Sequence, residues 1–162
     1  MHTQPATISE WSSHLFRTWG LTLTQLGHRV PLNVVATTQS GFVGVFTGAG
    51  TTLRLALYPA SAMVAVTLRP DCDCGEPHSD KARTRTQLDR SVAPVWQGSV
   101  DGAARYGWRG VDAALVPVPQ AAAILDELLH RAVREVPHTL PSPGARLRRR
   151  PAHTRRPVSS AA

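Results

Sequence analysis

The stretch that decides the fold is Thr52–Pro59, TLRLALYP, followed after three residues by Met63–Leu68, MVAVTL. In both segments every second residue is Leu or Val, which is the period of a β-strand that buries one face. Turn-forming residues at 59–61 leave a short connection, and short connections join antiparallel strands. The sequence therefore predicts an antiparallel hairpin with one buried and one wetter face.

Two further strands are predicted on the N-terminal side of this hairpin. Residues 32–37 and 42–46 are rich in Val, Phe and Thr, and turn signals follow them at 39–41 and 48–50. These short connections extend the hairpin into an antiparallel meander.

An N-terminal helix is predicted to precede the strands. Thr7 and Glu10 have the spacing of a capping box, and the apolar residues that follow recur every three or four positions up to Trp19. Gly20 is expected to end or weaken the helix. Residues 21–28 fit a further helical turn or two, although two threonines weaken that interpretation.

The C-terminal half is predicted to contain two more helices and a strand. Ser79 would cap a middle helix over 80–92, residues 103–110 form a loop or edge segment, and 111–118 form a strand. Residues 121–136 carry a broad apolar face and predict a C-terminal helix.

The expected fold class is α+β: an antiparallel meander sheet of four to five strands, with N-terminal, middle and C-terminal helices packed on one face. We expect one globular domain over residues 1–138 and a Pro- and Arg-rich disordered tail over 139–162. The element order over 8–136 resembles the small secretion-chaperone-like α+β fold. Such proteins are commonly dimers that bind a partner chain, and the resemblance transfers no functional residue.

The basic character of the chain is concentrated in that tail. The whole chain has 162 residues, a formal charge of +7 and a pI near 10.9. Residues 1–143 hold 12 basic and 11 acidic side chains, a net charge of +1, and residues 144–162 hold no acid. The tail arginines either bind nucleic-acid phosphates or are only solvated; they are Arg146, Arg148, Arg149, Arg150, Arg155 and Arg156.

The loop over 71–80 combines four acids with the ligand types of zinc. Cys72, Cys74 and His78 could face one ion, with a nearby acid or His14 or His28 as the fourth ligand. The alternative is a solvated connector without metal. Zinc is thus the one cofactor that the sequence suggests.

Several protein classes lack support. The sequence has no phosphate-binding loop, no nucleophile elbow and no HExxH zinc helix, so we expect no enzyme. It has no N-terminal signal-like segment and no long uncharged apolar run, so the expected location is the cytoplasm, without membrane association.

Aromatic residues suggest where a partner would bind. We expect Trp11 and Trp96 in the core, and Tyr106 and Trp108, among three glycines, as anchors at a protein interface. The leading hypothesis is a non-enzymatic interaction, adaptor or chaperone-like module that binds a protein partner or a second copy. The alternative is a nucleic-acid-associated protein that uses the tail arginines, with a structural zinc at Cys72.

Overall fold

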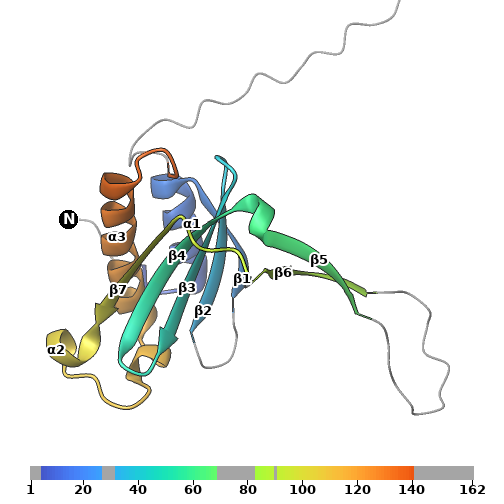
Figure 1. Cartoon of the computed structure of the whole chain (residues 1–162). Helices are drawn as coiled ribbons and strands as arrows, with labels where there is room; N and C mark the ends of the chain where they lie inside the picture. The colour runs from blue at the N-terminus through green and yellow to red at the C-terminus, as the bar shows by residue number, and fades with distance from the viewer. Residues whose placement is uncertain (1–4, 27–31, 69–82, 90, 141–162) are drawn as a thin grey trace, which may run out of the picture.

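The computed structural model describes residues 5–26, 32–68, 83–89 and 91–140 (Figure 1). Its elements, in chain order, are α1 (Ile8–Trp19), β1 (Leu21–Leu26), β2 (Asn33–Thr38), β3 (Phe42–Ala49), β4 (Thr52–Pro59), the 3-10 turn η1 (Ala60–Ala62), β5 (Met63–Leu68), β6 (Arg83–Leu88), β7 (Trp96–Asp101), α2 (Gly102–Tyr106), the 3-10 turn η2 (Asp112–Ala114) and α3 (Val118–Glu135).

The main sheet is antiparallel and has the strand order β1-β2-β3-β4-β7. On β4, Leu53, Leu55 and Leu57 are buried while Arg54 is exposed, as the alternating pattern predicts. Helices α1 and α3 lie against the buried face (Figure 1). The α+β class and the antiparallel meander are therefore confirmed. The hairpin predicted between 52–59 and 63–68 is wrong, because β4 pairs with β3 and β7 whereas β5 pairs with β6 in a second sheet.

Helix α1 begins and ends where its sequence signals lie. The Thr7 hydroxyl accepts from the Glu10 amide at 3.2 Å, and the Glu10 carboxylate accepts from the amides of Ala6 and Thr7 at 2.8 and 3.1 Å. Gly20 follows the helix with a φ of 63°, in the left-handed region that favours glycine. The predicted first helix is confirmed at both ends.

Helix α3 supplies much of the core, and the packed chain continues beyond it. One face of the helix is buried, from Ala121 to Ala132. After the helix, Thr139 and Leu140 are also buried, and the Ser40 hydroxyl donates to the Thr139 carbonyl at 2.9 Å. The packed region therefore continues two residues past the expected boundary at 138.

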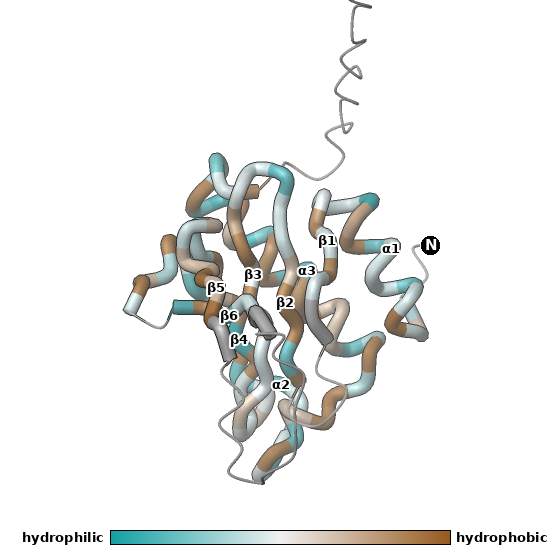
Figure 2. Tube along the Cα trace, turned by 90° about the vertical axis from the view of Figure 1, so that its right-hand side faces the viewer, coloured by the Kyte–Doolittle hydropathy of each residue, from teal (hydrophilic) through white to brown (hydrophobic). Residues whose placement is uncertain are grey.

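Strands β5 and β6 form a separate two-stranded sheet, which we call the arm. The arm extends away from the body on the side of the main sheet opposite α3 (Figure 1), and in the perpendicular view it lies in front of β3 and β4 (Figure 2). It is inserted between two strands that pair with each other, because Leu57 of β4 is the register partner of Trp96 of β7. The Val95 amide donates to the Leu57 carbonyl at 2.8 Å and closes the insertion.

Three further sequence-based assignments are wrong, and strand β7 was not predicted. The middle helix expected over 80–92 is contradicted by strand β6, and a five-residue helix, α2, occurs instead directly after β7. Residues 21–26 form strand β1 rather than further helical turns, because the alternating Thr residues favour extended backbone. The strand expected over 111–118 is the turn η2 followed by the start of α3, whose first turn contains Pro119.

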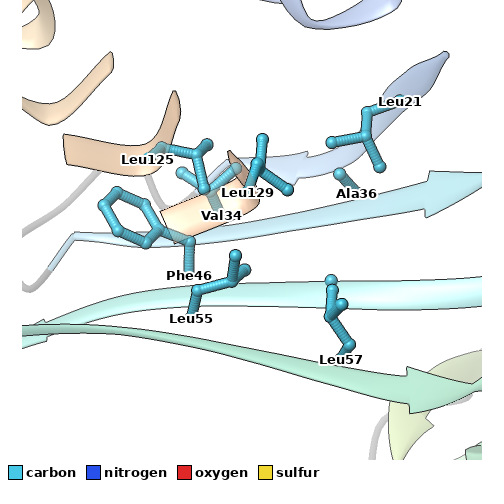
Figure 3. Close-up of a pocket in the computed structure, with 9 residues that line it drawn as sticks. Leu21, Val34, Ala36, Phe46, Leu55, Leu57, Leu125 and Leu129 are labelled. Carbon is cyan, nitrogen blue, oxygen red and sulfur yellow. The ribbon is translucent and has the colours of Figure 1, made fainter. Parts of the chain in front are cut away.

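The core contains a small apolar cavity between the sheet and α3 (Figure 3). Its volume is about 10 Å³, near the smallest that holds one water molecule, and Leu, Val, Ala, Phe and Gly residues line it. A wall without polar groups gives a water no hydrogen bonds, so this space is a packing defect rather than a ligand site.

Candidate protein-binding surface

The segment from α2 to η2 is fixed to the end of the main sheet by its backbone. The Gly102 amide donates to the Thr51 carbonyl at 2.8 Å, and the Ala113 amide donates to the Gly50 carbonyl at 3.1 Å. Strand β3 approaches η2 so closely that a Cβ on Gly48 would lie 2.2 Å from the Ala113 carbonyl oxygen. The backbone of this segment is therefore held in place by the β3–β4 turn and needs little further ordering to bind.

Trp108 contributes to this anchoring. A Cβ on Gly102 would lie 1.9 Å from the Trp108 indole, so the ring occupies the space that any side chain at 102 would need. The Trp108 amide also donates to the Gly102 carbonyl at 3.1 Å. The indole is half-buried and packs against the core, and only part of it faces outward.

The segment from α2 to η2 also exposes three large apolar side chains. Tyr106, Val111 and Leu115 have exposed fractions of 37%, 60% and 55%, the last two being the most exposed large hydrophobic residues in the described part of the chain. We call these three residues with Trp108 the α2–η2 surface. Val111 and Leu115 were not predicted as surface residues because 111–118 was assigned to a strand; the two glycines at 107 and 110, just before Val111, were the available signal of a loop.

Arginine adds charge beside the aromatic rings. The Arg105 guanidinium lies 5.3 Å from the Tyr106 ring centroid, within the range of a cation–π contact, and pairs with Glu127 of α3. The hydrogen bond with Glu127 raises the pKa of Arg105; like any arginine, this side chain is cationic at neutral pH. The Tyr106 and Trp108 rings lie 5.1 Å apart at an interplanar angle of 31°. Tyr, Trp and Arg are the residue types most enriched among the strongest binding residues of protein interfaces.

A cluster of polar side chains joins α1 to α3. The His14 Nε2 and Asp126 Oδ2 atoms lie 2.8 Å apart, and the Trp19 indole donates to the other Asp126 oxygen at 2.8 Å. Thr18 Oγ1 lies 3.5 Å from His14 Nδ1, at the outer limit of a hydrogen bond. The cavity of Figure 3 is lined by other residues, so these groups connect two helices and do not open onto that cavity.

The other predicted site residues lie outside the described residues. Cys72, Cys74 and His78 fall in 69–82, and the six tail arginines fall in 141–162. Among the residues that the structure describes, no three His, Cys, Asp or Glu side chains form a metal-binding group. None of the described helices is long and apolar enough to cross a membrane.

Comparisons with protein-family models, with curated proteins and with solved structures give no match for this chain. Inferences about function therefore rest on its own residues.

Proposed function

We propose that the protein is a non-enzymatic interaction module that binds a partner polypeptide through the α2–η2 surface. The observation that carries the proposal is the exposure of Tyr106, Val111 and Leu115 on a segment fixed by its backbone to the β3–β4 turn. A fixed apolar surface loses little conformational entropy on binding, so more of its buried area contributes to affinity. The cytoplasm is the location we propose for this activity.

A displayed library of random peptides tests the proposal without a known partner. The full chain is used for selection, and the enriched peptides are then measured against a variant with Tyr106→Ala, Val111→Ser and Leu115→Ser. We expect this variant to lose affinity by about tenfold or more, because residues at the centre of an interface contribute most of its energy.

A matched control separates a specific site from general hydrophobic adhesion. Ile8 and Phe16 on α1 are exposed by 45% and 44%, comparable to Tyr106, but lie on another element. The double variant Ile8→Ser, Phe16→Ser should bind the selected peptides as the unaltered chain does. The proposal would be contradicted by equal losses of affinity in both variants, or by selected peptides whose affinity the α2–η2 substitutions leave unchanged.

A second candidate function is favoured by the charge distribution: association with nucleic acid through the tail arginines, with a structural zinc at Cys72, Cys74 and His78. Six arginines and no acid in residues 144–162, beside a remainder of net charge +1, concentrate the attraction for phosphate in one segment. Removing 144–162 should abolish DNA or RNA binding that weakens steeply with salt. Binding that survives truncation contradicts the tail as the site, and elemental analysis without zinc contradicts the metal.

A further inference from the structure

The arm has an open edge that lacks the usual protection against strand pairing. Two-stranded sheets have two outer edges, and an unpaired edge presents a row of amides and carbonyls to any strand that fits. In the described part of the chain, no main-chain group of Val64–Leu68 bonds outside the β5–β6 ladder. The described chain has four outer strands: β1 and β7 at the edges of the main sheet, and β5 and β6 in the arm.

The other three outer strands carry recognised protective features. Strand β1 has a register irregularity between Leu23 and Gln25, and a bulge of this kind bends an edge away from flat pairing. On β7, Arg131 donates to the Ser99 carbonyl at 3.3 Å. The sequence of β6 contains Arg83 and Arg85, and charged residues discourage edge pairing.

Strand β5 has none of these features. Its sequence, MVAVTL, contains no charge and no proline, and its register with β6 is regular from Met63 to Leu68. Val64 and Val66 share one face of the arm and are half-exposed. An isolated two-stranded ribbon is only marginally stable in water, so a further strand paired with β5 would stabilise the arm by adding ladder hydrogen bonds and cross-strand contacts.

We propose that β5 pairs antiparallel with β5 of a second copy of this chain, which joins two arms into a four-stranded sheet β6-β5-β5-β6. A two-fold axis through the pair places the same segment on both sides, the usual arrangement in a homodimer. Self-pairing of β5 sets β-branched valines opposite each other without like-charge repulsion, a favourable cross-strand arrangement. Self-pairing of β6 would instead bring arginines together, which is why the second copy meets β5.

The test measures the mass of the full chain by light scattering and sedimentation between about 1 and 200 µM, the range in which a small interface dissociates. The unaltered chain should change from monomer to dimer as its concentration rises through this range. The double variant Val64→Lys, Val66→Lys and its counterpart Val64→Glu, Val66→Glu should each dimerise about tenfold more weakly, since both place like charges across the two-fold axis. An equimolar mixture of the two should recover a heterodimer.

The control places the same charge on the other strand of the arm. Thr86→Lys, Gln87→Lys adds two positive charges on β6, where both residues are exposed, and should leave the dimer unchanged. Recovery in the mixture also shows that the charged variants still fold. A chain that stays monomeric throughout the range, a control that dissociates equally, or a mixture that stays monomeric overturns the proposal.

This inference does not depend on the α2–η2 surface. A monomeric chain that still binds selected peptides would contradict the dimer and leave the proposed function standing.

Discussion

Two glycines on the helix-facing side of β3 illustrate how much a single missing methyl group matters. A Cβ on Gly44 would lie 3.5 Å from Leu57 and 3.7 Å from Leu55, at ordinary contact distances, inside the apolar cavity. Gly44→Ala should raise the free energy of unfolding by about 1 kcal/mol, because it buries a methyl group and reduces the freedom of the unfolded chain. Urea unfolding monitored by circular dichroism measures the change.

Gly48→Ala is the matched substitution on the same strand. Its Cβ would lie 2.2 Å from the Ala113 carbonyl oxygen, so η2 would have to move, at a cost of about 2 kcal/mol or more. The two alanine variants should therefore shift stability in opposite directions. Similar losses in both would show that the space beside Gly44 cannot take a methyl group.

Three buried tryptophans differ in what their indole N–H groups contact. Trp19 donates to Asp126 and Trp96 donates to Glu135, at 2.8 and 2.7 Å, whereas the buried Trp11 N–H has no partner among the described residues. All three Trp→Phe substitutions lose ring volume, but only those at 19 and 96 break a bond to a carboxylate. Trp11→Phe should therefore cost about 1 kcal/mol less than Trp19→Phe in denaturant unfolding. Equal costs would mean that ring volume alone determines the loss.

At the residue scale, the sequence predicted which side chains are buried better than it predicted which side chains contact each other. Trp11 and Trp96 were expected in the core, and both are buried. The contact between His14 and Asp126 could not be predicted, because 112 positions separate the two residues and only the crossing of α1 with α3 brings them together.

At the scale of one element, the capping box gives α1 a dependence on pH. Bonds from the amides of Ala6 and Thr7, in that order, lower the pKa of Glu10 from its ordinary value of 4.5. A carboxyl whose pKa is lowered by folding stabilises the protein fully above the unfolded value, and this contribution is lost as the pH falls through the folded value.

The variant Glu10→Gln should lack this dependence. The unfolding free energies of the two proteins should converge as the pH is lowered below about 4.5, and they should differ most near neutrality. Other acids, such as Asp89, titrate equally in both proteins and cancel in the difference. A difference that stays constant with pH would exclude a role for the Glu10 carboxylate in capping.

Strands β1, β6 and β7 were not predicted from the sequence, and the first two share one pattern. Strand β1 has the sequence LTLTQL and strand β6 has the sequence RTRTQL, so both carry Thr at their second and fourth positions followed by Gln and Leu. Alternating β-branched residues favour extended backbone even where the intervening side chains are polar. The apolar alternation of β4 was easy to recognise because the core imposes it, whereas β1 and β6 are outer strands with weaker demands.

At the scale of the whole molecule, the arm is an insertion between neighbouring strands of the body. Replacing residues 60–94 by a short turn should leave the body folded, since Leu57 and Trp96 already pair and Val95 already bonds to Leu57. We expect an unchanged tryptophan near-ultraviolet circular dichroism signal and a cooperative thermal transition. The shortened chain should also be a strict monomer, and loss of the cooperative transition would show that the body needs the arm.

The same insertion has a consequence for the order in which the chain folds. Strands β1 to β4 meet through nearby segments, but β7 must find β4 across the 36 residues numbered 60–95. Closing a flexible connection of that length costs about 2 kcal/mol more conformational entropy than closing a four-residue turn. The part of the core that β7 and α3 supply therefore packs late in folding, and until it does the leucines of β4 remain exposed to water. A long arm therefore lengthens the interval in which the newly made chain is most prone to aggregate.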